Sequence, residues 1–217
     1  MMLSLRNGHN IHHALAVFQR RLAGRGAAAA ILARVADALA RHDGRADTPE
    51  HRVGAVALAR AFGIATLDEA PAQAFSWDGR VIRTRTEASV IVHEIAHWLV
   101  SAPARRGVID FGLGAGPESG RAVEADASRC MDEAACEHEE YQASLLGVIL
   151  ELELDQPGHL AFIEQNWLEG FERDSAADHF AAIAADLVSA GLIDREGRAR
   201  MPPGWCVSLP SPRRACA

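Results

Sequence analysis

The sequence of 217 residues lacks the signals of several common protein classes. It contains no run of 18 apolar residues, which a membrane-spanning helix needs, and its first ten residues hold no long apolar leader segment. Its four cysteines form no Cys-x-x-Cys pair, so neither a zinc ribbon nor a redox dithiol is indicated. These absences predict reduced thiols, a cytoplasmic location and no membrane partner.

An excess of positive charge is also missing, because 22 basic residues stand against 29 acidic ones and the formal net charge is −7. Binding to nucleic acid needs a concentrated positive surface, so we expect no nucleic-acid partner. A negative balance suits a basic partner or an acidic metal site better. Hydrophobic residues make up 49% of the chain, which is enough to fill the core of one ordinary domain.

Two patterns near the N-terminus predict helices. Apolar residues recur at helical spacing over residues 11–42, and Gly24 and Gly26 are expected to divide this stretch into two helices. Thr48 is a suitable N-cap for a further helix over residues 49–62. These segments predict a helical layer at the start of the chain.

The remainder of the chain predicts more helices and one short strand. The β-branched residues 81–85 predict the strand, and the glycines of residues 107–122 predict a loop. Further helices are predicted over residues 87–100, 127–154, 160–171 and 176–192.

Together these elements predict an α+β fold that is mostly helical, with a small sheet packed against the helix at residues 87–100. We expect three parts: a helical N-terminal layer (residues 1–72), a metal-binding catalytic domain (73–200) and a proline-rich tail (201–217).

The segment His93-Glu94-Ile95-Ala96-His97 indicates a metal site. Side chains four residues apart lie on the same face of a helix, about 6 Å from each other, so two imidazoles there can share one metal ion. Glu94 is close enough to meet a water molecule bound to that ion, as a general base does in metallopeptidases. The surrounding residues are apolar, and burying these polar groups without a partner would be costly.

A third protein ligand is expected from a later acidic segment. The small residues Ala143, Ser144 and Gly147 share a helix face with Glu140 and would let this helix approach the first one closely. This pattern favours Glu140 as the ligand, with Glu137 as the alternative and His138 as a further candidate. The Glu-x-x-His and Glu-x-x-Glu spacings also leave a two-metal site open.

Several spaced motifs resemble those of the bacterial elongation factor P hydroxylases, over roughly residues 79–157. Those proteins share a His-Glu-Ile-x-His-Trp helix, then Arg-Arg, Asp-Phe-Gly, a Pro…Gly-Arg loop and a Glu-x-x-Glu pair. The matching residues here are His93 to Trp98, Arg105-Arg106, Asp110-Phe111-Gly112, Pro117, Gly120-Arg121, and Glu137 with Glu140.

The resemblance implies a non-haem iron, Fe(II), held by two histidines and one carboxylate, which uses dioxygen to hydroxylate the lysyl-modified lysine of elongation factor P. It makes His93, His97 and Glu140 the ligands and Glu94 a proton-handling group. Arg105, Arg106 and Asp110 would shape the pocket or its lid. The expected partner is a protein or peptide substrate, with elongation factor P as the first candidate.

One alternative interpretation uses the same pentapeptide. A zinc metallopeptidase would hold zinc at His93 and His97 and use Glu94 as its general base. The spaced Arg-Arg and Asp-Phe-Gly matches favour the hydroxylase, because peptide hydrolysis does not call for them. A non-catalytic structural metal site is disfavoured, since structural zinc sites fill all four positions with protein ligands and the cysteines lack suitable spacing.

Overall fold

The computed structural model of the protein describes residues 8–42, 47–117 and 119–205. The elements in these ranges are α1 (Gly8–Leu22), α2 (Ala27–Arg41), α3 (Pro49–Ala61), β1 (Ala65–Leu67), η1 (Pro71–Gln73), β2 (Val81–Arg83), α4 (Ala88–Val100), η2 (Pro103–Arg105), η3 (Ile109–Gly112), α5 (Ala122–Ala127), α6 (Glu133–Glu153), α7 (Gly158–Glu164) and α8 (Asp174–Ser189). None of the described helices is long and apolar enough to cross a membrane.

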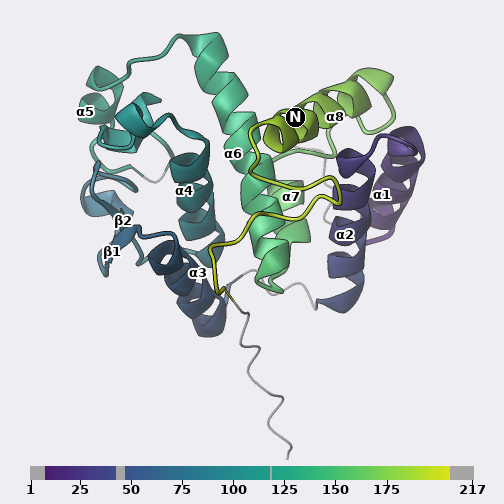
Figure 1. Ribbon diagram of the computed structural model, residues 1–217, viewed down its shortest axis with the longest axis horizontal. Coiled ribbons are helices and arrows are strands. Elements are labelled where there is room, and N and C mark those ends of the chain that lie inside the picture. The colour runs from purple at the N-terminus through teal and green to yellow at the C-terminus, as the bar shows by residue number, and fades with distance from the viewer. Residues whose placement is uncertain (1–7, 43–46, 118, 206–217) are drawn as a thin grey trace, which may run out of the picture.

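Helix α6 forms the middle of the molecule (Figure 1). The side chain of Asp132 accepts a hydrogen bond of 2.9 Å from the backbone N–H of Ala135 and so begins the helix. All residues from 143 to 152 are buried, so this half of the helix lies in the core on every side. Helix α4 packs on one side of α6, whereas α2, α7 and α8 lie on the other.

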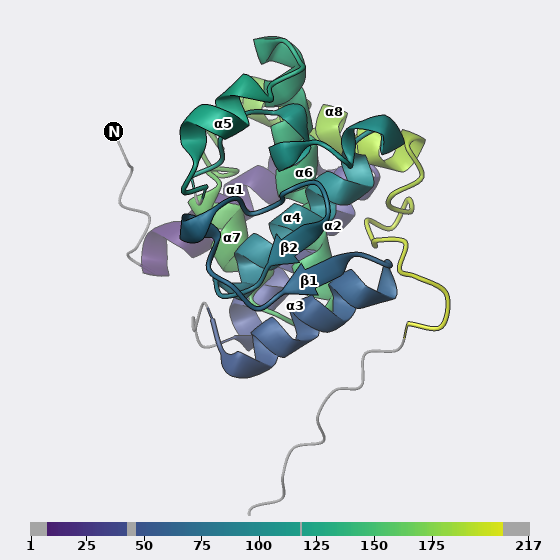
Figure 2. The same ribbon diagram turned by 90° about the vertical axis from the view of Figure 1, so that its left-hand side faces the viewer.

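Helix α4 lies between α6 and the sheet (Figure 2). Its apolar residues Ile91, Val92, Ile95 and Ala96 are fully buried, which explains why the segment is hydrophobic over most of its circumference. The carboxylate of Asp47 accepts a hydrogen bond of 3.2 Å from the first backbone N–H of the helix. The α4 backbone is therefore held at its N-terminus and along both sides.

The sheet has two short parallel strands, in which Thr66 pairs with Ile82. The strand predicted over residues 81–85 is confirmed over residues 81–83. The second side of β2 is contacted as well, because Trp77 forms an antiparallel bridge with Ile82. A mostly helical α+β fold with a small sheet packed on α4 is thus confirmed.

The predicted glycine break and the predicted N-cap near the N-terminus are confirmed. The chain turns between α1 and α2, where Gly24 and Gly26 have φ of 80° and 56°, a region that favours glycine. The hydroxyl of Thr48 accepts a hydrogen bond of 3.1 Å from the backbone N–H of His51 and caps α3 as expected.

Two predicted helices are shorter than expected. The helix predicted over residues 127–154 begins at Glu133 instead, because α5 ends at Ala127 and the chain turns before the Asp132 cap. The helix predicted over residues 160–171 ends at Glu164, since Asn166 and Gly170 both adopt positive φ. Hydrophobic periodicity continues across these breaks, so the sequence pattern alone did not show them.

The predicted division into an N-terminal layer and a catalytic domain stays a prediction. Strand β1 lies before residue 72 and pairs with β2, which lies after it, and one continuous hydrophobic cluster includes buried residues of both parts. Of the predicted tail, Met201 and Trp205 are partly buried against this cluster. Residues 206–217 lie outside the described residues.

One buried carboxyl group in α6 makes stability depend on pH. Glu151 is 5% exposed, and burial, with a smaller contribution from Glu164, raises its pKa from 4.5 to about 8. At pH values between about 5 and about 8, Glu151 is protonated in the folded protein but ionised in the unfolded chain. The group's contribution to the free energy of unfolding therefore falls, by about 1.4 kcal/mol per pH unit, as the pH rises from about 5 to about 8.

We accordingly expect Glu151→Gln to match the parent's stability near pH 5 and to exceed it by roughly 3 kcal/mol near pH 7.5. Urea denaturation at both pH values measures this difference. The control is Glu153→Gln, which removes an ion pair with Arg34 (2.8 Å) and should lower stability instead. Parallel pH profiles for Glu151→Gln and the parent would contradict the prediction.

Candidate metal centre

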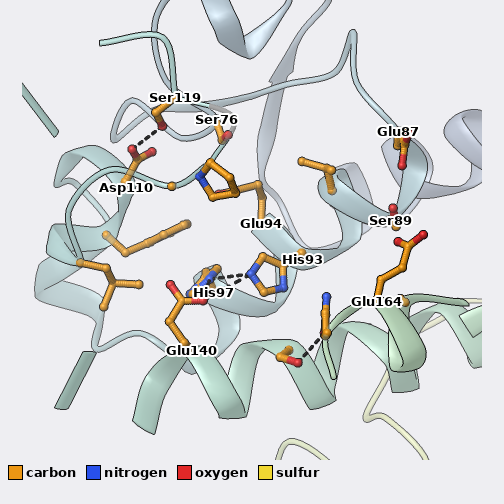
Figure 3. A pocket seen from close by; sticks show the side chains of 18 of the residues that line it. Ser76, Glu87, Ser89, His93, Glu94, His97, Asp110, Ser119, Glu140 and Glu164 are labelled. Atoms are coloured by element: carbon orange, nitrogen blue, oxygen red, sulfur yellow. Dashed lines mark hydrogen bonds and ion pairs between the residues drawn. The ribbon is translucent and has the colours of Figure 1, made fainter. Parts of the chain in front are cut away.

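Three predicted ligands converge between α4 and α6 (Figure 3). The Nε2 atoms of His93 and His97 lie 3.0 Å apart. An oxygen of Glu140, from α6, lies 3.6 Å from the first and 3.4 Å from the second. Ligand atoms about 2.0–2.2 Å from one ion are separated by roughly these distances, so the three side chains fit a single metal ion.

The chemistry of these three groups also fits a metal ion. Both rings turn the same nitrogen, Nε2, toward the other, and without a metal ion one Nε2–H can donate a hydrogen bond to the other Nε2. A cation would bind the Nε2 lone pairs of both rings in the tautomer that carries its proton on Nδ1, and the carboxylate would balance part of its charge. Two imidazoles and one carboxylate suit ferrous iron, zinc and related divalent ions.

The pKa shifts at the site follow from burial and from the closeness of the three groups. Burial and the neighbouring His97 lower the pKa of His93. Burial by itself would lower the pKa of His97, but its hydrogen bond and charge interaction with Glu140 raise it. Burial would raise the pKa of Glu140, yet its interactions with both histidines hold that pKa well below its usual range. Glu140 is therefore an ionised carboxylate at neutral pH, the form that binds metal.

Glu94 faces the same cleft as the two histidines. Burial raises its pKa to about 8, and the carboxylates of Asp110 and Glu140 act in the same direction. In the form without a metal, Glu94 thus carries a proton at neutral pH. A carboxyl group with this pKa beside a metal site can hold or release a proton near physiological pH.

The cleft beside the three ligands has a volume of about 500 Å³. One wall is formed by residues 110–117 together with Ser119, and the opposite end is formed by α7 and the start of α4 (Figure 3). Its charged lining residues are all acidic or histidine, which makes the cleft favourable for a cationic group. The carboxyl groups that line it belong to Glu87, Glu94, Asp110, Glu140 and Glu164.

The Asp-Phe-Gly segment forms a strained turn against the site. Asp110, Phe111 and Gly112 have φ of 41°, 54° and 74°, and the first two are unusual for residues with a side chain. A β-carbon on Gly112 would lie 2.3 Å from the sulfur of Cys130, so glycine is required there. Such strain is common where a fold holds a functional group in place.

Hydrogen bonds and ring stacking hold this turn in place. The carboxylate of Asp110 accepts a hydrogen bond of 2.6 Å from the hydroxyl of Ser119. The ring of Phe111 is stacked between Trp77 and His97, with centroids 5.3 Å and 5.6 Å away. The turn therefore reaches a metal ligand through Phe111. Burial raises the pKa of the Asp110 carboxyl, against the hydrogen bond from Ser119.

The two predicted arginines lie next to the site but do not line its cleft. Arg105 pairs with the carboxylate of Glu139 and donates a hydrogen bond of 2.7 Å to the carbonyl of Phe111. The guanidinium of Arg106 lies 3.9 Å from the centre of the Trp98 ring. Of the three predicted pocket or lid residues, Asp110 is the one that lines the cleft.

The other candidate ligands lie elsewhere. Glu137 is exposed, and its carboxylate accepts a hydrogen bond of 3.4 Å from the hydroxyl of Tyr141. His138 is directed toward α8, where its Nε2 lies 3.3 Å from a carboxylate oxygen of Asp186. Among the described residues, one group of metal-ligating side chains gathers closely enough for an ion, and it contains neither of them.

Some residues of the site were not predicted as functional. Phe111 belongs to the Asp-Phe-Gly motif, so its position was marked but its contact with His97 was not. Glu139 gave no signal of its own, because four carboxyl residues lie within the segment from Glu133 to Glu140 and their spacing does not show which one is buried.

The fold and the site together define the class: a mostly helical α+β protein with a candidate mononuclear metal centre of two histidines and one carboxylate. No protein-family model, no curated protein and no solved structure matches this chain.

Proposed function

We propose that this protein is an oxygen-dependent hydroxylase with a non-haem ferrous iron, acting on a side chain of a protein or peptide. The observation that supports it most strongly is the convergence of His93, His97 and Glu140 in one cleft. Two histidines and one carboxylate leave open positions on the metal. With iron bound, such a site supplies the activation of dioxygen.

The separate motifs that resemble the elongation factor P hydroxylases lie together in space. The Asp-Phe-Gly turn stacks on His97, and Arg105 connects this turn to the residue beside Glu140. The Arg-Arg and Asp-Phe-Gly motifs thus lie beside the three candidate metal ligands, as expected if all of them serve one active site. This arrangement supports the hydroxylase over an accidental pentapeptide.

Other residues of the cleft would transfer protons, exclude water and attract the substrate. The Glu94 carboxyl group lies in the cleft beside the metal ligands and can accept a proton from, or pass one to, a group bound there. Phe111, Leu113 and Ala161 supply apolar walls that exclude water from one part of the cleft. The acidic lining favours a substrate side chain that carries a positive charge.

The proposed substrate is a lysine-derived side chain of a protein, with elongation factor P as the first candidate. An amine-bearing side chain complements the carboxyl groups of the cleft, and the formal net charge of −7 favours a basic partner surface. Hydroxylation inserts one oxygen atom into a C–H bond and reduces the other to water. It therefore also consumes two electrons and two protons, which a reductant supplies.

A zinc metallopeptidase is the second candidate, favoured by the position of Glu94 in the cleft beside both histidines. A peptidase must hold an extended peptide over its metal, and a free sheet edge is a common way to do so. Strand β2 offers no such edge at Ile82, because β1 pairs with it on one side and Trp77 bridges it on the other. This strand, which packs on the metal-binding helix, therefore gives a peptidase no edge at Ile82 on which to hold its substrate.

The metal and the reaction distinguish the two candidates. We expect the chain, purified without chelators, to bind one iron per molecule and to consume oxygen when supplied with ascorbate and a lysyl-modified elongation factor P. The modified residue should gain the mass of one oxygen atom. The control is the same protein after dialysis against a chelator, which should show neither effect until Fe(II) is restored. Tightly bound zinc together with cleavage of peptides would overturn the hydroxylase in favour of the peptidase.

A further inference from the structure

The first half of α6 is weakly anchored, although it carries a metal ligand. From residue 133 to residue 142 most side chains are exposed or half-buried, and Cys136 and Glu139 are the ones that are buried. Glu140 itself points from this half toward the cleft. Its position relative to the α4 histidines therefore depends on what holds the neighbouring residue, Glu139.

Arg105 is the group that holds Glu139. Its guanidinium pairs with a carboxylate oxygen of Glu139 through Nη2, and its Nη1 donates the 2.7 Å hydrogen bond to the Phe111 carbonyl. Both the Arg105 and the Glu139 side chains are largely buried, so water competes little for this contact. One planar guanidinium thus connects α6 with the strained turn.

The Asp110–Gly112 turn also contacts His97. The Phe111 ring stacks on the imidazole at an interplanar angle of 20°, and Trp77 supports it from the other side. Metal-binding histidines usually have their second ring nitrogen fixed by a hydrogen bond. The Nδ1 of His97 is buried and has no such partner among the described residues, so packing against Phe111 orients this ring.

From these contacts we infer that Arg105 is a positioning residue that sets Glu140 and His97 at the separation one metal ion needs. It acts on one ligand through Glu139 and on the other through Phe111, and it does not touch the metal or the substrate. The inference rests on the metal site of the proposed function. It gives the two arginines of the Arg-Arg motif different roles, since Arg106 stacks on Trp98 instead.

The test compares Arg105→Lys with Arg106→Lys. Lysine keeps the charge but lacks the planar fork, so at position 105 it cannot serve both Glu139 and the Phe111 carbonyl. We expect Arg105→Lys to weaken binding of Co(II), used as a spectroscopic probe, by about 10- to 100-fold and to change its absorption spectrum. Arg106→Lys should bind Co(II) as the parent does.

A second variant, Phe111→Leu, keeps Arg105 and removes the stacking on His97, and it should also alter the cobalt spectrum. Thermal unfolding of each metal-free variant shows whether the protein is folded at the temperature of the titration. If Arg105→Lys kept the parent affinity and spectrum, or Arg106→Lys lost as much affinity, the inference would be overturned while the metal site remained. If the parent bound no divalent metal, the metal site itself would be wrong.

Discussion

Replacing Glu140 by alanine is expected to lower the affinity for Fe(II) by more than about 100-fold, because it removes one of the three ligand atoms that face the ion. The loss should exceed the 10- to 100-fold that changes around a metal site typically cause. A titration with Co(II), used as a spectroscopic probe in place of Fe(II), should show the same loss of affinity. In thermal unfolding, added metal should raise the midpoint of the parent but not that of the variant.

Glu137→Ala is the matched control. It removes the same charge from the same acidic segment, but the Glu137 carboxylate lies outside the ligand group. Its metal affinity should equal that of the parent. Loss of binding in Glu137→Ala with retention in Glu140→Ala would show that Glu137, and not Glu140, is the metal ligand from α6.

Replacing Gly147 by leucine is expected to abolish metal binding although all three ligands remain. A β-carbon at this position would lie 3.6 Å from the Cα and 3.8 Å from the Nδ1 of His93, so the two helices touch here. Leucine places three further carbon atoms into that contact and must move α6 away from α4. We expect the free energy of unfolding to fall by about 2–3 kcal/mol, as for other overpacked cores.

The control for this change is Gly147→Ala, because a single β-carbon at 3.6 Å is in ordinary van der Waals contact. Alanine also favours the helix by about 1 kcal/mol over glycine. This variant should be at least as stable as the parent and should bind metal equally well, as urea denaturation and metal titration would show. Normal metal binding by Gly147→Leu would contradict the proposed dependence on helix spacing.

Local patterns predicted much of the site because its features are local. His93 and His97 are one helical turn apart, so their shared direction follows from helix geometry alone. The face of Ala143, Ser144 and Gly147 predicted a close helix approach, and the packing of α6 on α4, with a β-carbon added at Gly147 lying 3.6 Å from the His93 Cα, confirms it. The caps at Thr48 and the break at Gly24 are also decided by neighbouring residues.

Choosing among neighbouring carboxylates needed the tertiary structure. Glu137, Glu139 and Glu140 are adjacent and chemically alike, and a rotation of α6 by a fraction of a turn would exchange their roles. The contact with α4 decides that Glu140 faces the histidines, while Arg105 holds Glu139. The same holds for the ends of the helices near Ala127 and Glu164, where apolar periodicity continues but the backbone turns.

The sequence by itself determined that the imidazoles of His93 and His97 and the carboxyl group of Glu94 lie on one turn of an apolar helix, since the backbone geometry of a helix is the same in every protein. Only the tertiary structure decided which acidic side chain of α6 joins the two histidines as the third ligand and which contacts hold that side chain in place. Those choices depend on the rotation and spacing of α4 and α6, and on a turn stacked against His97, and such long-range contacts leave no fixed interval in the sequence.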